Sequence, residues 1–141
     1  MQDRPTRTEL LAAVRRFLEE DVVPATTGRR QFLARVSVHT LALVERELGH
    51  EERHAEREWE GLDGVLGGEP RPARFEELGD ALQQRNRALC ERIRDGSFDV
   101  EGTARERLVA HLRETVREKL EVADPALLRR DDAQRKPSTS R

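Results

Sequence analysis

The sequence predicts an all-α fold, a helical bundle of four main helices and a short, charged third helix. Three observations support this prediction. Apolar residues recur at spacings of three and four, no segment alternates apolar and polar residues as a strand does, and 38% of the 141 residues are charged. Such a charge content indicates helices with wide solvated faces. We expect a single domain over residues 1–128 and a disordered tail over 129–141, which has little to bury.

The first helix is expected over residues 8–22. Thr6 and Glu9 have the spacing of a capping box, in which the hydroxyl and the carboxylate each accept a hydrogen bond from an unpaired backbone amide. Pro24 ends the helix because it has no backbone N–H. The apolar residues form one stripe: Leu10, Leu11, Val14, Phe17, Leu18 and Val22.

The second and third helices are expected over residues 29–48 and 51–66. The second is the most apolar stretch of the chain, and Gly49 is interpreted as its C-terminal cap. The third is almost wholly charged in its first half, and its apolar residues crowd at the far end. Residues 67–74 contain two Gly and two Pro and are expected to form a loop.

The fourth helix is expected over residues 75–94, with a narrow apolar stripe and Gly96 after its end. The fifth begins near Thr103, which has Glu106 three residues later and so resembles a second capping box. Pro125 stops this helix.

Residues 50–54 spell His-Glu-x-x-His, the spacing that places two zinc ligands on one helix face. In a zinc hydrolase, Glu51 would be the general base. The intervening Glu52 and Arg53 are charged, and burying this segment would be costly. The sequence suggests only Glu76 or Glu77 as a third ligand. We therefore expect a solvated helix with no catalytic residue, cofactor or resident metal, although the pair His50 and His54 can bind metal adventitiously.

Three basic side chains on the second helix fall opposite its apolar arc: Arg35, His39 and Arg46. They form either a solvated stripe or a polar contact row for a partner protein. Arginine is enriched in interfaces because its planar group makes two parallel hydrogen bonds to a carboxylate or phosphate.

Four other polar residues project into or beside apolar stripes: Asp21, Glu47, Asn86 and Lys119. The charged ones lie near helix ends, so they can reach water by extending along the surface. The alternative is a buried or inter-subunit polar network, in which Glu47 pairs with Lys119, because an isolated buried charge is too costly to persist.

Bulk composition argues against several classes of protein. A net charge of −2 and an aromatic content of 4% do not favour nucleic-acid binding. No apolar run approaches the roughly 18 residues of a transmembrane helix. The single Cys90 excludes an internal disulfide, and the N-terminus has no apolar signal region. We expect a cytoplasmic protein that binds neither nucleic acid nor membrane.

Several segments resemble a bacterial domain-of-unknown-function family of small helical proteins. The resemblance covers most of residues 4–125 and includes the segments "RPTRTELLAAVRRFLEEDVVPATTG", "RRQFLARVSVHTLALVEREL", "LQQRNRALCERIRDG" and "LVAHLRETVREKLEVADP". Members are commonly encoded beside aminoglycoside-phosphotransferase-like kinases and acyl-CoA dehydrogenases. The resemblance implies an accessory subunit of such a kinase, of the kind that phosphorylates hydroxyacyl-CoA intermediates.

One position departs from the family pattern, where His39 replaces the usual Asn and introduces a group that titrates near pH 6.5. The family-like residues of this chain are Glu20, Asp21, Pro24, Gly28, Phe32, Arg35, Val36, Arg46, Glu47, Asn86, Arg94, Gly96, Lys119 and Pro125.

The sequence therefore leads us to expect a non-catalytic interaction subunit of a phosphotransferase-like kinase in acyl-CoA metabolism. Two other interpretations stay open. The protein can be a free-standing homo-oligomer, or a zinc-dependent hydrolase that uses His50, Glu51 and His54.

Overall fold

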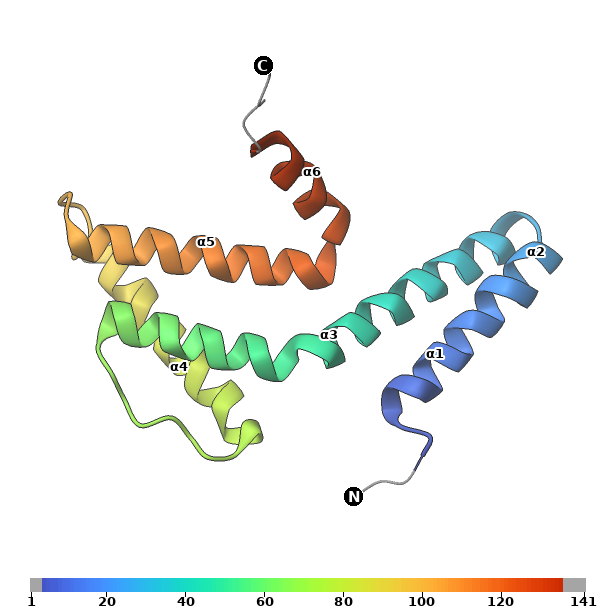
Figure 1. The fold of residues 1–141 in the computed structure, drawn as a ribbon, viewed down its shortest axis with the longest axis horizontal. Helices are drawn as coiled ribbons and strands as arrows, with labels where there is room; N and C mark the ends of the chain where they lie inside the picture. Colours follow the sequence, from blue (N-terminus) through green and yellow to red (C-terminus); the bar gives the residue numbers. More distant parts are fainter. Residues whose placement is uncertain (1–3, 136–141) are drawn as a thin grey trace, which may run out of the picture. The chain divides into compact units, whose positions relative to one another are not determined.

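The computed structural model describes residues 4–135, and every regular element in that range is a helix, which confirms the predicted all-α class. The contacts divide the chain into two compact units, the first ending at His50 and the second beginning at Glu51, where we expected one domain over residues 1–128. The elements are α1 (Arg7–Phe17), the π-helical turn η1 (Leu18–Val22), α2 (Val23–Ala25), α3 (Gly28–Leu66), α4 (Phe75–Arg94), α5 (Thr103–Ala123) and α6 (Pro125–Arg135) (Figure 1).

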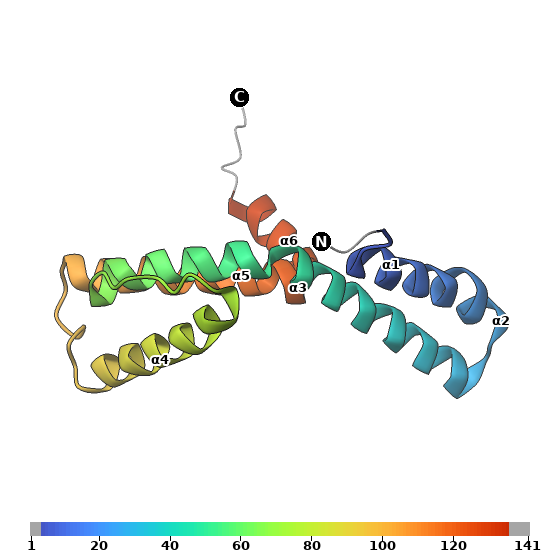
Figure 2. The same ribbon diagram turned by 90° about the horizontal axis from the view of Figure 1, so that it is seen from below.

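The first unit is a helical hairpin in which α1 runs beside the first half of α3 (Figures 1 and 2). The predicted capping box is confirmed, because the amide of Thr6 donates to Glu9 Oε2 over 2.7 Å and the amide of Glu9 donates to Thr6 Oγ1 over 3.2 Å. Arg15 joins the two helices through an ion pair of 3.1 Å with Glu45. Ala34 is the only apolar residue before position 51 that the structure buries among the residues described.

The first helix ends less abruptly than predicted, through the π-helical turn that precedes Pro24. The proline ring crowds the carbonyl four residues earlier, so the hydrogen-bond ladder widens by one residue. The amide of Val23 accordingly donates to the carbonyl of Leu18, five residues back. Thr26 Oγ1 then donates to the carbonyl of Val22 over 2.8 Å, which satisfies one of the acceptors left at the helix end.

The predicted second and third helices are one continuous helix, α3, so the expected bundle of four main helices with a separate short third helix is not what forms. Gly49 does not cap a helix end. Its φ is not positive, whereas the glycine that follows α3, Gly67, has a φ of 106°. A lone glycine costs a helix only about 1 kcal/mol relative to alanine, and the Glu, Arg and Ala residues around it are good helix formers. The helix therefore runs through Gly49.

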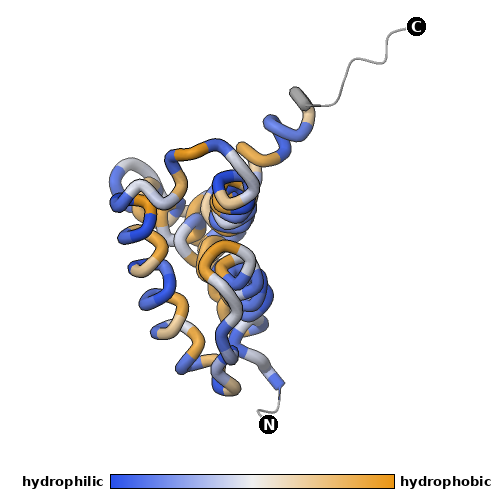
Figure 3. The backbone as a smooth tube through the Cα atoms, turned by 90° about the vertical axis from the view of Figure 1, so that its left-hand side faces the viewer, coloured by the Kyte–Doolittle hydropathy of each residue, from blue (hydrophilic) through white to orange (hydrophobic). Residues whose placement is uncertain are grey.

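The core of the molecule lies in the second unit, between the second half of α3, α4 and α5. Apolar and polar positions interleave along these helices, as amphipathic packing requires (Figure 3). Trp59 and Leu62 are 4% and 0% exposed, which confirms that the apolar end of the predicted third helix is buried. The core cluster comprises Trp59, Leu62, Leu78, Leu82, Leu89, Phe98 and Leu108.

The two ends of α5 differ in how well the sequence predicted them. Its start is not a capping box, since Gly102 is the N-cap and no side chain caps the helix. Thr103 lies one position too late, inside the first turn. The predicted end is confirmed, because α5 stops at Ala123, two residues before Pro125.

The predicted disordered tail begins too early, because α6 is helical through Arg135. Asp124 Oδ1 accepts the amides of Ala126 and Leu127 over 3.1 and 3.2 Å and so starts this helix. Arg117 on α5 makes two parallel hydrogen bonds of 3.1 and 3.0 Å to Asp132 on α6. The rest of the predicted tail, residues 136–141, lies outside the described residues.

Candidate functional site

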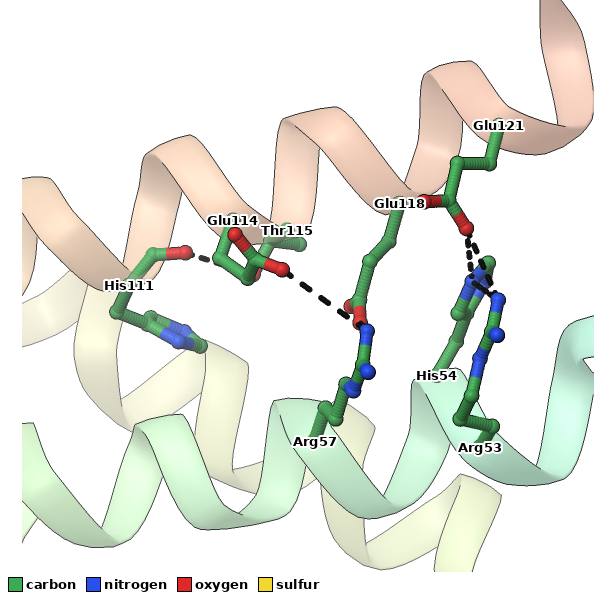
Figure 4. Close-up of polar contacts among 8 residues, drawn as sticks. All are labelled: Arg53, His54, Arg57, His111, Glu114, Thr115, Glu118 and Glu121. Carbon is green, nitrogen blue, oxygen red and sulfur yellow. Dashed lines mark hydrogen bonds and ion pairs between the residues drawn. The ribbon is translucent and has the colours of Figure 1, made fainter. Parts of the chain in front are cut away.

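Two rows of opposite charge face each other across α3 and α5 in the second unit (Figure 4). Residues three or four apart share one face of a helix, so each row is a consequence of sequence spacing. The basic row on α3 meets the acidic row on α5 through ion pairs that join Arg53, His54 and Arg57 to Glu114, Glu118 and Glu121.

Glu121 is the centre of the first cluster in this pair of rows. Its Oε2 lies 3.0 Å from His54 Nε2 and accepts a hydrogen bond of 3.0 Å from Arg53. A nitrogen of Arg53 also lies 3.3 Å from His54 Nε2. The side chains of His54 and Glu121 are 16% and 31% exposed, so water screens their interaction only in part.

Glu118 is the most buried acid of the second cluster, at 4% exposure. Arg57 approaches it at 3.4 Å and reaches Glu114 at 4.0 Å. Burial raises the pKa of Glu118, because desolvation disfavours the carboxylate, while the charges of His54 and Arg57 act in the opposite direction.

His111 lies two turns before Glu118 on α5 and is 7% exposed. The imidazole packs against Gly61 of α3, where a Cβ atom added to the glycine would lie 2.3 Å from the imidazole Nδ1. Only a glycine leaves room for the ring at this point. Burial lowers the pKa of His111 and favours the neutral ring, with the negative charge of Glu58 opposing the effect.

A groove of about 590 Å³ opens beside His111 and is lined by residues of α3, α4 and α5. Two residues of the predicted polar network, Asn86 and Lys119, line this groove with Glu58. The amide of Asn86 donates to Glu58 Oε1 over 2.6 Å. Asn86 therefore fixes a carboxylate at the edge of the groove.

Arg85 is a buried cation that the sequence analysis did not single out. Its guanidinium stacks over the ring of Trp59, 4.4 Å from the centroid, and donates to Asp63 over 2.6 Å and to the carbonyl of Gly67 over 2.7 Å. These contacts tie α4 to the end of α3 and satisfy most of its donors. Its role is structural, and Asp63, twenty-two residues earlier, forms no pattern with it that the sequence alone reveals.

The proposed partner-contact row is only partly at the surface. Arg35 and His39 are exposed on α3, as the wheel of the predicted second helix indicated. Arg46 is half-buried and already has an interaction within the chain. Only the first two residues are therefore fully presented to solvent.

Of the four residues of the predicted polar network, Asp21, Glu47 and Lys119 are exposed instead of buried, and Asn86 is half-buried. The π-helical turn adds a residue to the ladder and so shifts Asp21 away from the position that an α-helical wheel gives it. On α5, Leu112 and Val116 share the helix face of Lys119 and are themselves exposed, so this part of the stripe is not a core face.

The His-Glu-x-x-His segment lies on α3 with His50 and His54 both half-buried. Glu76 and Glu77, the third ligands that the sequence suggested, are exposed in the first turn of α4. Glu121 instead approaches His54. Sequence reasoning missed it because 67 residues separate the two, although the acidic spacing on α5 matches the basic spacing on α3.

A family model described as Domain of unknown function (DUF6285) matches residues 24–127. This chain belongs to that family. The match confirms that the sequence resembles a domain-of-unknown-function family. The matched range includes residues of both compact units of this chain. No curated protein and no solved structure matches the chain. In the part of the chain that the structure describes, no helix combines the length and apolarity needed to cross a membrane.

Proposed function

We propose that this protein is a non-catalytic interaction subunit and that the helical hairpin of the first unit is its docking surface. The observation that supports this proposal is the exposure of large apolar side chains on both helices of the hairpin. On α1, Leu10, Val14 and Phe17 are 54%, 51% and 57% exposed. Their spacing of four and three residues places them on one face of that helix.

The α3 side of the hairpin has a second set of exposed apolar side chains. Phe32, Leu33 and Val36 are 64%, 49% and 44% exposed. Arg35 and His39 lie exposed beside them on the same helix. Apolar anchors with arginine at the edge are typical of protein interfaces. We name these apolar residues of the two helices, Leu10, Val14, Phe17, Phe32, Leu33 and Val36, the hairpin face.

Burial by a partner would stabilise the hairpin, whose own core is small. Burying one large apolar side chain contributes roughly 1.5–3 kcal/mol relative to leaving it exposed. Because the first unit buries Ala34 alone among its described apolar residues, and the residues of the hairpin face are 44–64% exposed, part of this free energy is unused in the isolated chain. Several large apolar side chains exposed on one pair of helices suggest a site of protein association.

The partner that we propose is a phosphotransferase-like kinase of the hydroxyacyl-CoA type. This partner is implied by the family resemblance. The exposed hairpin face is compatible with a kinase partner. The exposed Arg35 is available to pair with carboxylates at the edge of the partner's interface. In this proposal the kinase carries the chemistry, and the accessory subunit stabilises it.

Co-purification with the kinase encoded nearby in the native host tests the proposal. The double variant Val14→Glu with Phe32→Glu places two charges on the hairpin face and introduces good helix formers. We expect at least about tenfold less of the variant to co-purify with tagged kinase, because burying an unpaired charge is costly. Circular dichroism establishes that the variant is folded.

The matched control is Val100→Glu, since Val100 is 84% exposed but lies in the second unit, outside the hairpin face. It should co-purify like the wild type. Equal recovery of the double variant and the wild type would contradict docking through the hairpin face.

The same exposed face also suits self-association, which is the second candidate function. Light scattering of the isolated protein separates the two. A dimer that Val14→Glu with Phe32→Glu converts to a monomer would assign the hairpin face to a second copy of this chain instead of the kinase.

A further inference from the structure

Among the residues that the structure describes, His50, His54 and Glu121 form the one group of three side chains placed to hold a metal ion. Each offers one ligand atom, these atoms lie within 4.8 Å of one another, and all three residues are half-buried. Two imidazole nitrogens and a carboxylate oxygen are a donor set that zinc and similar divalent ions accept.

The position of His50 relative to His54 follows from helix geometry alone. His50 and His54 are four residues apart on α3, which is uninterrupted between them. This spacing places both rings on one face, about one turn apart. His50 adjoins Glu51 on this uninterrupted helix.

The third ligand comes from α5, where Glu121 packs against the second histidine. His54 Nε2 lies 3.0 Å from Glu121 Oε2 (Figure 4). Tetrahedral zinc with bonds of about 2.0–2.1 Å separates its ligand atoms by roughly 3.3 Å. A small side-chain adjustment therefore suffices to admit an ion.

We propose that His50, His54 and Glu121 bind one zinc-class divalent ion and that the ion ties α3 to α5. The sequence suggested no resident metal because it offered no third ligand near the two histidines, and the structure supplies Glu121 as that ligand. Three protein ligands leave a fourth coordination position for water. This proposal is independent of docking through the hairpin face.

The positive charge of Arg53 disfavours a cation at this site, which gives a second way to test the proposal. Its guanidinium bonds Glu121 Oε2 over 3.0 Å and lies 3.3 Å from His54 Nε2. An ion bound to the same two atoms replaces this contact and is repelled by the guanidinium charge. Removing Arg53 should therefore tighten metal binding, the opposite of what removing a ligand does.

Calorimetric titration of the tag-free, chelator-treated full chain with zinc chloride at about pH 7.5, where an ordinary imidazole is mostly neutral, tests the site. We expect one ion per chain. His54→Gln and Glu121→Gln should each weaken binding at least about tenfold, and Arg53→Gln should strengthen it. His39→Gln is the matched control, because His39 lies exposed on the same helix outside the group and should leave the affinity unchanged.

Absence of stoichiometric zinc binding by the wild type would overturn the proposal, as would equal affinities for the wild type and folded His54→Gln. If His54→Gln does not fold, His50→Gln gives the same comparison, since it removes a ligand and leaves the contact of His54 with Glu121 in place. An unchanged affinity in folded His50→Gln would also overturn it.

Discussion

His111 shows at the scale of one residue how the fold changes the chemistry of a side chain. The sequence placed this histidine on a helix and gave no reason to single it out. The structure buries the ring against Gly61, and burial lowers its pKa from the ordinary histidine value of 6.5. The unfolded chain then binds a proton more readily than the folded chain, so acid favours unfolding.

We expect the free energy of unfolding to fall as the pH decreases through about 6.5, the pKa of an unfolded histidine, and to level off below the lowered folded pKa of His111. His111→Gln removes the titrating group and should flatten this part of the profile. Urea unfolding between about pH 5 and 8, the range in which histidine titrates, measures it. The exposed His39 provides the control His39→Gln, and a slope that His111→Gln leaves as steep as in the wild type would refute this account.

The contact of His111 with Gly61 makes a second prediction for a single residue. Gly61→Ala adds a Cβ that would lie 2.3 Å from the imidazole, so the ring or the helices must shift. We expect a destabilisation of about 1–3 kcal/mol, as for other overpacked cores. Gly64→Ala, with no neighbouring atom within 4 Å on the same helix, should instead stabilise by about 0.5–1 kcal/mol. Chemical denaturation distinguishes the pair, and equal effects would rule out the steric explanation.

At the scale of elements, α3 is the main departure from the sequence prediction. A glycine followed by a highly charged segment has the pattern of a helix end, but the pattern does not say whether the glycine adopts a left-handed conformation. Gly49 does not, and no proline follows it within α3. The charged segment is held in the helix by α5, whose acidic row pairs with Arg53 and Arg57.

The continuity of α3 predicts the effect of Gly49→Ala. A helical glycine with no atom within 4 Å of the added methyl group gains helix propensity, so the free energy of unfolding should rise by about 0.5–1 kcal/mol. Thermal or urea unfolding measures the change. A left-handed cap would instead be destabilised by alanine, and a loss of stability would therefore restore the two-helix interpretation.

At the scale of the whole molecule, burial is distributed unequally between the two units. The core cluster lies in the second unit, from Trp59 to Leu108, whereas the hairpin face of the first is exposed. Amides open more easily where few apolar contacts are lost on opening. The first unit is therefore the less stable part of the chain and the part that a partner can order.

Hydrogen exchange followed by mass spectrometry tests this difference. We expect the amides of α1 to exchange at least about tenfold faster than those of α4, because α1 buries no residue and α4 buries four. Adding the docking partner should slow exchange in α1 and leave α4 unchanged. Equal protection of both helices in the free protein would contradict the unequal stability.

The sequence by itself determined the helical class, the capping box at Thr6, the span of α4 and the end of α5. These features are local, since they depend on residues within one or two turns of one another. Only the tertiary structure decided which apolar stripes are buried, why Lys119 is exposed and which acid reaches His54. The physical reason is that a periodic pattern specifies a helix face but not its partner, and the partner determines burial, charge pairing and pKa.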